Sequence, residues 1–449
     1  MNIVVCGAGE VGSQAVDLLA NKGGHNVTVV DHDPERLLPI EETMDVRTLA
    51  GNCADTTVLR AAGAESAAVM IAATNQDEIN LLAASMAKRL GSRRVIARVH
   101  DVAFVQDRGE EYQSHLNIDR LICPEYATAQ AIARGIRNPG AVAIEHFARG
   151  QIEMQEFVAS EGGSAIGKRL MDVRFPTGTR LALISRKGDA IVPKASSVVA
   201  PGDTVILVGN ADTFDAARKL FKADKVSRRK VVLMGGPPIA RWLCESLRDR
   251  AFSIRLFERD RARAAELSES LSWATVLASD PTDRAVFEEE NLGQADLFIS
   301  LLSSDEANII AGAMAKVRGV AEVMTICQQS KYVDTILEIG VDKVFSPRSY
   351  AGDEIESFLD ETPTRYMGSL AQGVVDVFRV RIGERSAAVG KPLQDLGLAP
   401  DWVVAALQRG RDVHVPTAQD IIDRGDVALV VGRHGTEETL GRLLIGTAP

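Results

Sequence analysis

The chain has 449 residues, of which 46% are hydrophobic and 25% are charged, so wholesale disorder is excluded and roughly two to four domains are expected. Its formal net charge is −10, and its densest basic run, Arg228-Arg229-Lys230, is short and is interpreted as a linker. The chain is therefore not expected to bind nucleic acid, which usually requires a basic face.

Short apolar runs alternate with helical patterns over residues 1–123. The apolar runs predict strands at residues 3–6, 27–30, 69–73 and 95–99. The helical patterns lie at residues 11–20, 34–40 and 80–90. Continuously apolar strands that are separated by helices are typical of a parallel sheet covered on both faces. This alternation predicts a doubly wound α/β domain of the Rossmann type.

A helical connector and a smaller module follow. The connector helix is expected at residues 124–140, where Asn138-Pro139-Gly140 ends it. Residues 141–225 predict a small α+β domain with a helix at 213–221 and strands at 153–158, 181–185, 190–192 and 204–208. Lys187-Gly188-Asp189 predicts a hairpin turn between two of these strands.

The second half of the chain repeats this order. Residues 2–7 parallel residues 230–235 at an offset of about 228, and residues 164–168 parallel residues 387–391 at an offset of about 223. The chain is therefore interpreted as a tandem duplication. Its second copy is expected to comprise an N-terminal domain at 228–346, a connector at 347–365 whose helix spans residues 347–359, and a C-terminal domain at 366–449.

The first predicted strand runs into the glycine-rich turn Gly7-Ala8-Gly9-Glu10-Val11-Gly12, which opens the first helix. In such a GxGxxG turn the glycines permit a tight turn, close approach of the backbone to a pyrophosphate, and close packing of helix on strand. The helix N-terminus adds free N–H groups. Asp31 ends the second strand, where its carboxylate can accept both ribose hydroxyls of an adenosine. These features predict a nucleotide site; the alternative is a turn that only packs.

Asp31 also bears on which nucleotide binds. Its carboxylate would repel a 2′-phosphate, and His32-Asp33 supply no neighbouring arginine, so NAD(H) is favoured over NADP(H). ATP and ADP carry the same ribose and are alternatives at the same site.

Further contacts are predicted where other strands end. Gly51 and Asn52 follow a further short strand before residue 51, Ala73, Thr74 and Asn75 lie at the end of the strand at 69–73, and Arg98 lies at the end of the strand at 95–99. Ligands of open α/β sheets lie at this carboxyl edge, so these residues could border the adenine or the phosphates. The alternatives are that Thr74 and Asp77 cap the next helix and that Arg98 pairs with a structural acid.

The equivalent turn in the second half departs from this pattern. Gly235-Gly236-Pro237-Pro238-Ile239-Ala240 keeps only the first glycine of the motif, and its two prolines lack N–H donors. Glu258 retains an acid where the first half has Asp31, whereas Ile326 stands where the first half has Arg98. We expect the second N-terminal domain to bind dinucleotide weakly or not at all and to act as a structural partner.

No catalytic or metal-binding pattern is found. The five cysteines lack a CxxC pair, the seven histidines lack metal-ligand spacing, and His146 and His414 lack charge partners in sequence, which argues against hydride transfer. Residues 162–168 match the front of a P-loop, but Arg169 replaces the magnesium-binding Ser or Thr, so a structural turn is expected. No apolar stretch reaches the roughly 18 residues of a transmembrane helix, and no signal peptide is visible.

Together these motifs resemble the TrkA family of potassium uptake proteins, which are built from RCK (regulator of potassium conductance) units. The resemblance covers essentially the whole chain. It rests on the glycine turn with Asp31, residues 51–55, Asp77-Glu78 with Asn80, and the paired segments 164–170 and 387–393. It implies two Rossmann-like N-domains, each followed by a small α+β C-domain, and an N-domain that binds NAD(H) or adenine nucleotides without catalysis.

The resemblance also implies partners. Members of the family are cytosolic and form rings, expected here to be a dimer or tetramer of the tandem chain, that dock beneath an integral-membrane potassium transporter subunit and gate it. The apolar connector residues Ala131, Ile132, Ile355, Phe358 and Leu359 are candidates for the ring-forming surface, and the alternative is that they pack in an ordinary core. The alternatives are an NAD-dependent oxidoreductase with an unrecognised substrate domain, and a scaffold whose nucleotide modules are both empty.

Overall fold

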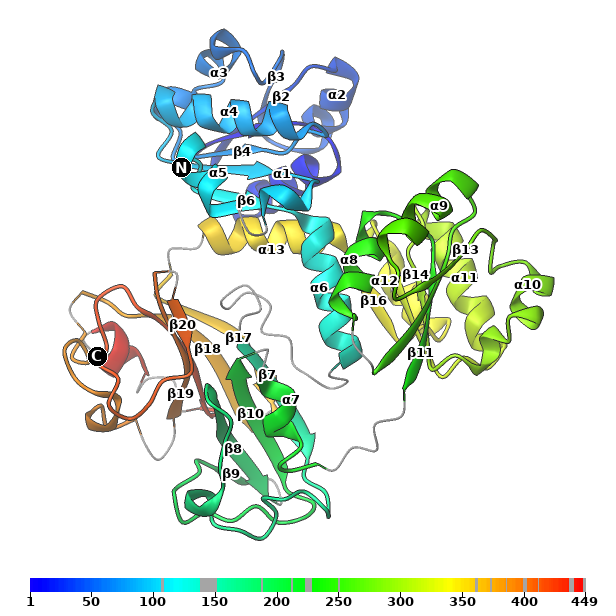
Figure 1. Cartoon of the computed structure of the whole chain (residues 1–449). Helices are drawn as coiled ribbons and strands as arrows, with labels where there is room; N and C mark the ends of the chain where they lie inside the picture. The colour runs from blue at the N-terminus through cyan, green and yellow to red at the C-terminus, as the bar shows by residue number, and fades with distance from the viewer. Residues whose placement is uncertain are drawn as a thin grey trace. The chain divides into compact units, whose positions relative to one another are not determined.

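The computed structural model describes residues 1–105, 109–137, 152–186, 189–210, 213–222, 228–248, 251–359, 362–371, 374–384, 386–398, 402–410, 412–435 and 440–446. The expected helix end at Asn138-Pro139-Gly140, the turn residues Lys187-Gly188 and His146 lie outside them. The chain forms two compact units, Met1–Ala133 with Ser227–Leu359 and Arg134–Val226 with Asp360–Pro449 (Figure 1). Within the described ranges, no helix combines the length and apolarity needed to cross a membrane.

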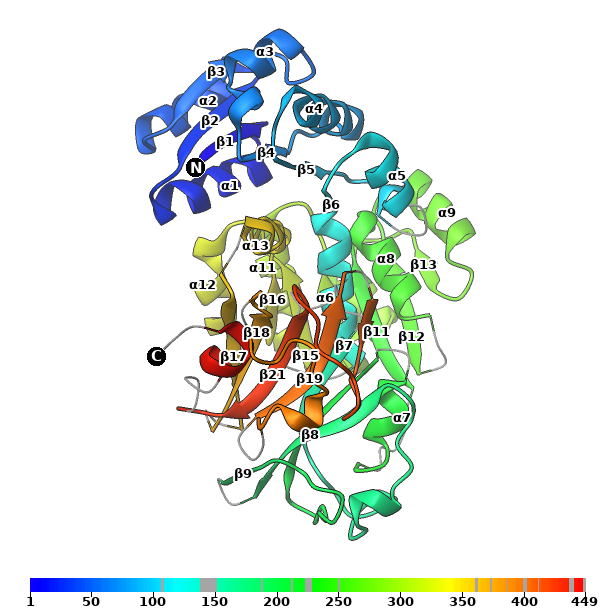
Figure 2. The same cartoon turned by 90° about the vertical axis from the view of Figure 1, so that its left-hand side faces the viewer.

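The first N-domain is built on a six-stranded parallel sheet with the order β3-β2-β1-β4-β5-β6. Its strands are β1 (Asn2–Cys6), β2 (Asn26–Asp31), β3 (Arg47–Ala50), β4 (Val69–Ala72), β5 (Arg94–Arg98) and β6 (Arg120–Ile122). Its helices are α1 (Glu10–Lys22), α2 (Pro34–Thr43), α3 (Thr56–Ala61), α4 (Asp77–Leu90) and α5 (Gly109–Leu116). Helices α1 and α4 cover opposite faces of the sheet (Figure 2), which confirms the doubly wound prediction. The strand order reverses between β1 and β4, where such sheets bind ligands.

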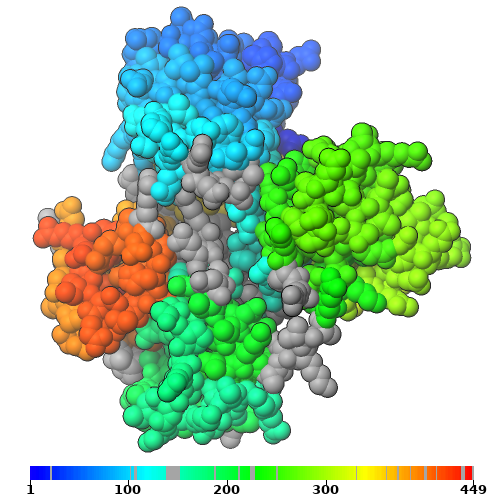
Figure 3. Space-filling model, viewed as in Figure 1, coloured from blue at the N-terminus to red at the C-terminus, as the bar shows by residue number. Residues whose placement is uncertain are grey.

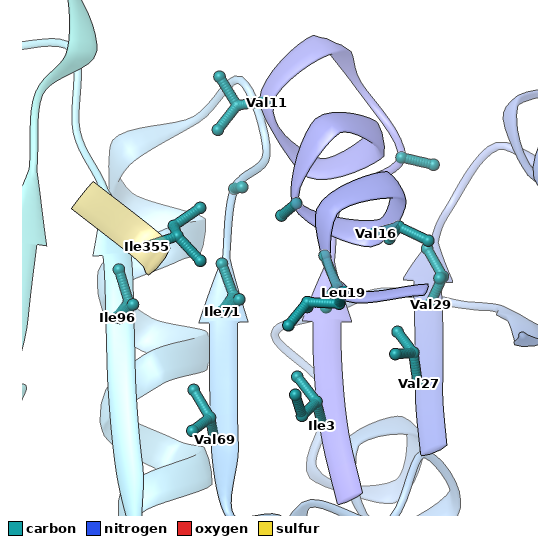
Figure 4. Close-up of a cluster of buried hydrophobic side chains, with 14 of the residues drawn as sticks. Ile3, Val11, Val16, Leu19, Val27, Val29, Val69, Ile71, Ile96 and Ile355 are labelled. Atoms are coloured by element: carbon teal, nitrogen blue, oxygen red, sulfur yellow. The ribbon is translucent and has the colours of Figure 1, made fainter. Parts of the chain in front are cut away.

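The core of this domain lies between the sheet and α1. Alternate residues of each strand, such as Ile3, Val29 and Ile71, point to one face and are buried there (Figure 4). Helix α1 contributes Val16 and Leu19, which are three residues apart and so share one face of the helix. This packing fixes the glycine turn between β1 and α1 against the end of the sheet.

The second N-domain repeats the topology, with the strand order β13-β12-β11-β14-β15-β16. Its strands are β11 (Arg229–Met234), β12 (Phe252–Phe257), β13 (Thr275–Leu277), β14 (Leu297–Ser300), β15 (Glu322–Ile326) and β16 (Lys343–Phe345). Its helices are α8 (Pro238–Ser246), α9 (Arg261–Ser270), α10 (Arg284–Glu289), α11 (Asp305–Val317) and α12 (Val333–Glu338). Figure 3 shows the outer surface of the first N-domain in blue and cyan and much of that of the second in green.

The connector helix α6 (Pro124–Arg137) leaves the first N-domain and packs against the second. Tyr126 lies edge-on to Trp242 of α8, with ring centroids 5.9 Å apart. Gln130 Nε2 donates a hydrogen bond of 2.9 Å to Ser246 Oγ at the end of α8.

The connector helix α13 (Pro347–Leu359) makes the reciprocal crossing and packs on α1 of the first N-domain. Its Ala351 and Ile355 belong to the core of that domain, and Figure 4 shows Ile355 above Ile71 and Ile96. Arg120 of β6 also forms an ion pair of 2.8 Å with Glu354. The two N-domains therefore exchange their connector helices.

The second unit holds two antiparallel sheets, with the orders β7-β10-β8-β9 and β17-β18-β21-β19-β20. The first comprises β7 (Ile152–Val158), β8 (Thr179–Arg186), β9 (Asp189–Ile191) and β10 (Thr204–Asn210), followed by α7 (Phe214–Arg218). The second comprises β17 (Thr364–Leu370), β18 (Val375–Arg381), β19 (Trp402–Arg409), β20 (Asp412–His414) and β21 (Val427–Arg433). One apolar cluster, to which Ile206 and Leu429 belong, joins the two sheets.

The second connector helix has the expected bounds, because α13 spans Pro347–Leu359. Only the end of the connector region, placed at residue 365, lies too far along the chain, since β17 begins at Thr364. Pro363 disfavours helical backbone at the residue before it, which explains why the helix ends ahead of this residue.

Two smaller expectations also need correction. Helix α7 ends at Arg218 rather than at residue 221, because the chain turns there and buries Phe221 in the core. The apolar connector residues Ala131, Ile132 and Ile355 are buried inside the first unit, and Phe358 and Leu359 pack against its core, so the core-packing alternative holds rather than the ring-forming surface.

Candidate nucleotide site

The glycine turn has the geometry that its sequence predicts. Gly7 has a φ of +101°, and a Cβ there would lie 2.7 Å from the carbonyl oxygen of Ala73, so a larger residue is excluded. A Cβ at Gly12 would collide with the carbonyl oxygen of Gly7. At Gly9, by contrast, the nearest atoms to an added Cβ are 3.8 Å away, an ordinary contact distance, and this side of the turn faces the cleft described below. The turn thus presents backbone at the N-terminus of α1, as a phosphate-binding turn requires.

Asp31 is tied to this turn. Its side chain is buried, and its carboxylate accepts hydrogen bonds of 2.6 Å from Ala8 N–H and 2.9 Å from Asp33 N–H. His32 Nδ1 lies 3.1 Å from the same carboxylate. The acid therefore stands beside the glycine turn at the end of β2, the position from which it would meet a ribose.

A cleft of about 880 Å³ opens over the turn. Of the residues that the sequence singles out, five line it: Ala8, Gly9, Glu10, Asn75 and Arg98. The second half of the chain supplies a further part of the wall that the sequence did not indicate: Gln328, Gln329, Lys331, Ser346, Arg348 and Ser349.

The charge of the cleft favours anions. Its cationic lining residues are Arg36, Arg98, Lys331 and Arg348, whereas its acidic lining residues are Glu10 and Asp17. Arg36 pairs with Asp33, Arg98 with Glu125 and Arg348 with Glu10, so the attraction of this concave site for a phosphorylated ligand depends on how far these ion pairs can open.

Arg98 combines the two alternatives that its sequence position left open. It lines the cleft, is 8% exposed, and forms an ion pair of 2.7 Å with Glu125 at the start of α6. Its buried Nε finds no hydrogen-bond acceptor among the described residues. A guanidinium with a buried N–H to spare is suited to an anion that the chain itself does not provide.

Arg348 reaches the cleft from α13. It pairs with Glu10, the first residue of α1, at 3.0 Å, and its Nε likewise lacks an acceptor among the described residues. No local sequence signal marks Arg348 as a site residue, because it reaches the first glycine turn only through the crossing of α13.

The remaining predicted site residues do not belong to the lining of the cleft. Gly51 N–H donates to the Asp31 carbonyl at 2.8 Å, and Asn52 Oδ1 accepts from Ala54 N–H within its own turn. Gly7, Val11, Gly12, Asp31, Ala73 and Thr74 are likewise absent from the lining of the cleft. These residues shape the site rather than border this cavity, and their contact with a nucleotide stays a prediction.

Thr74 and Asp77 do not cap α4, as one alternative expected. Gln76 is the N-cap and makes no side-chain capping bond. Thr74 Oγ1 instead donates to the buried Asn80, and the Asp77 carboxylate accepts the N–H groups of His100 and Asp101. Thr74 thereby ties the end of β4 to α4, and Asp77 ties the start of α4 to the loop after β5.

The environment of Asp77 lowers the pKa of its carboxyl. Burial alone would raise this pKa, but hydrogen bonds from the His100 ring and from the backbone of Asp101 and His100 favour the charged form more strongly. The loop beside the cleft therefore depends on an ionised Asp77.

Asp77→Asn is expected to destabilise the protein at pH 7 but not in strong acid. Because the folded-state pKa lies below the ordinary value of about 3.9, the stabilisation is complete above that value and is lost as the pH falls through the folded-state pKa. Denaturant unfolding of both proteins between pH 7 and pH 3 measures this difference. A gap that stays constant over the range would contradict a role for the charge.

The second glycine turn keeps its shape but is filled by side chains of its own domain. Gly235 has a φ of +96°, and Glu258 accepts a hydrogen bond of 2.9 Å from Gly236 N–H, as Asp31 does from Ala8. However, Arg263 Nε donates to the carbonyl of Gly236 at 2.6 Å. A Cβ at Gly236 would also lie 2.5 Å from a methyl group of Leu267. This crowding adds to the missing N–H of Pro237 in disfavouring phosphate there.

The cysteines are poor nucleophiles. All five are free thiols and buried. Burial raises the pKa of Cys123 and of Cys244 to about 12, so both are protonated at neutral pH. Among the described residues, no three His, Cys, Asp or Glu side chains gather as a metal site would require.

The fold and the site together define a tandem protein of two Rossmann-type modules, of which the first keeps the complete glycine turn with its acid, each followed by an antiparallel C-domain. The TrkA-N domain family matches residues 3–124 and 231–347, and the TrkA-C domain family matches residues 154–222 and 377–445. The chain belongs to the TrkA family.

Relatives match over nearly the full length. The chain is 32% identical over 434 residues to the Trk system potassium uptake protein TrkA homolog of Archaeoglobus fulgidus, which covers 96% of this chain and 97% of the relative. Identity to the Trk system potassium uptake protein TrkA of Halomonas elongata is 30% over 433 residues, with 95% and 94% covered.

Solved structures show the same fold. The GsuK RCK domain superposes with a TM-score of 0.59 at 19% identity, covering 98% of this chain and 94% of that one. The GsuK channel bound to NAD gives a TM-score of 0.59 at 18% identity, covering 99% and 78%. These neighbours place the chain in the RCK fold.

Proposed function

We propose that the protein is a nucleotide-sensing regulatory subunit of a potassium uptake system. The observation that carries this proposal is the cationic cleft over the complete glycine turn of the first N-domain, in a chain of the TrkA family. NAD(H) is the favoured ligand, and ATP or ADP is the alternative at the same site. The membership in a family named for potassium uptake supports the transport role.

The residues of the cleft fit such a ligand. The N–H groups at the start of α1, beside Gly9, would hold a pyrophosphate, and Arg98 offers its spare N–H to the same anion. Asp31 would accept the ribose hydroxyls, which requires its carboxylate to give up part of its bonding to the turn. A nicotinamide would serve here as a recognised group rather than as a hydride carrier.

The exchanged helices supply a route from the cleft to the C-domains. Helix α13 carries Arg348 at the cleft and continues into β17, and α6 carries Glu125, the partner of Arg98. A ligand that favours one arrangement of these helices shifts the equilibrium only by its differential affinity. Coupling between two sites is typically about 1–3 kcal/mol, which is enough to bias a gate.

The same proposal covers the assembly. Copies of the chain would associate into a ring, as a dimer or tetramer, and dock from the cytoplasm onto an integral-membrane potassium transporter subunit. Size measurement by light scattering and co-purification with such a subunit test these two parts.

Calorimetric titration with NADH, NAD, ATP and ADP is expected to show one site per chain. The second turn should stay silent, because Pro237 lacks an N–H donor and Arg263 occupies the Gly236 carbonyl. Two sites would contradict our reading of the second turn. Steady turnover of NADH with a substrate would favour the oxidoreductase, and no binding of any nucleotide would overturn the sensor.

A further inference from the structure

Two acidic side chains of the chain itself form ion pairs with two arginines of the cleft, Arg98 and Arg348. Glu125 Oε1 lies 2.7 Å from Arg98 Nη2, and Glu10 Oε1 lies 3.0 Å from Arg348 Nη2. Both arginines line the cleft, and each keeps a buried Nε without an acceptor among the described residues. Each guanidinium is therefore held by one carboxylate and has donors left for a second anion.

These two ion pairs involve equivalent positions of the repeat. Glu125 is the second residue of α6 and Arg348 the second residue of α13, each directly after the proline that opens its helix. The pairs have opposite polarity, because α6 contributes the acid and α13 contributes the cation. One cleft is thus linked by charge to the first turn of both exchanged helices.

We propose that Glu125 and Glu10 are internal competitors of the nucleotide phosphates, so that binding exchanges two intramolecular ion pairs for ion pairs with the ligand and releases the first turns of α6 and α13. This inference rests on the proposed function, because it needs a phosphate in the cleft. It adds a regulatory role for two carboxylates that the nucleotide motif does not explain.

The phosphates of the ligand and the carboxylates of Glu125 and Glu10 carry the same charge and therefore repel each other. A phosphate that approaches Arg98 or Arg348 also approaches the carboxylate that each already holds, and two anions at one guanidinium repel. Arg98 is 8% exposed, so this repulsion is weakly screened by water. The ligand gains most when the carboxylate withdraws, and withdrawal of Glu125 or release of Arg348 loosens the helix that carries it.

Glu125→Gln and Glu10→Gln test the competition, since each keeps the size of the side chain and removes its charge. Glu125→Gln is expected to bind nucleotide about three- to tenfold more tightly than the wild type in calorimetric titration, and the effect should shrink at high salt. Glu10→Gln should also bind more tightly but gain less, because Glu10 is 61% exposed and its charge is better screened by water. Glu354→Gln is the matched control: it neutralises an acid of α13 that pairs with Arg120 and does not line the cleft, so affinity should be unchanged.

Hydrogen exchange tests the release. Addition of saturating NADH or ATP should speed the exchange of backbone amides in the first turns of α6 and α13. Unchanged or weaker binding by both variants, or protection of these turns by the nucleotide, would overturn the inference. Absence of binding by the wild type, by contrast, would overturn the proposed function itself, so the two failures are distinguishable.

Discussion

Replacing Asp31 with alanine should weaken the binding of NADH or ATP by at least about 100-fold, with the affinities measured by calorimetric titration. A buried carboxylate that accepts two ribose hydroxyls makes two charge-assisted hydrogen bonds, each of which contributes about 1.5–3 kcal/mol. The substitution also frees Ala8 N–H, which donates to Asp31 at 2.6 Å, so the glycine turn loses its anchor as well. Both effects act in the same direction on affinity.

The repeat provides the control for this experiment. Glu258→Ala removes the equivalent acid, which accepts from Gly236 N–H at 2.9 Å, and so causes a similar local loss of hydrogen bonding. Affinity should stay within about twofold of the wild type, because the second turn is not expected to hold a phosphate. If both substitutions weaken binding equally, the loss reflects general destabilisation and not contact with the ribose.

Ile355→Ala should lower the unfolding free energy of the first N-domain by about 2–4 kcal/mol. Ile355 is fully buried and belongs to the core that includes Ile71 and Ile96, although it comes from the second connector helix (Figure 4). Truncating it leaves a cavity that the rigid sheet cannot close. Hydrogen exchange of the β4 and β5 amides measures the loss within this domain, where a whole-chain melting curve would mix several domains.

Ile310→Ala offers a matched control for this second prediction. Ile310 lies on α11 and is 58% exposed, so the same change of side chain should cost less than about 0.5 kcal/mol. An Ile355→Ala protein whose β4 and β5 amides exchange as slowly as those of the wild type would show that α13 does not complete the core of the first N-domain.

The sheets could be predicted from the sequence because their signals are local. Runs such as 3–6 and 69–73 are apolar throughout, as strands buried on both faces must be. In the intervening helices, apolar residues recur about every 3.6 residues, as one face of a helix requires. The duplication then extended the prediction to the second half. The end of α7 was misjudged, because the apolar Leu220 and Phe221 continue the helical pattern although the helix ends at Arg218.

The site was predictable only where its residues follow one another along the chain. The glycine turn and Asp31 are connected by one strand–helix–strand unit, so their spacing carries the information. Arg348 and Lys331 reach the cleft through the tertiary path of the second half, which no spacing encodes. Asp77 resembled a helix cap in sequence, but its partners, His100 and Asp101, come from the next strand's loop.

The exchange of α6 and α13 has a consequence for how such a chain can diversify. Two separate copies of one half could satisfy the same exchange as a symmetric pair, but every substitution would then occur twice, once at each glycine turn. Joining the halves in a single chain removes that constraint. Arg348 can stand where its counterpart is Glu125, and Pro237 can occupy one turn while Gly9 remains in the other. In the fused pair, the first half can keep the complete glycine turn, while the second half can change its own turn and contribute residues to the wall of the first cleft.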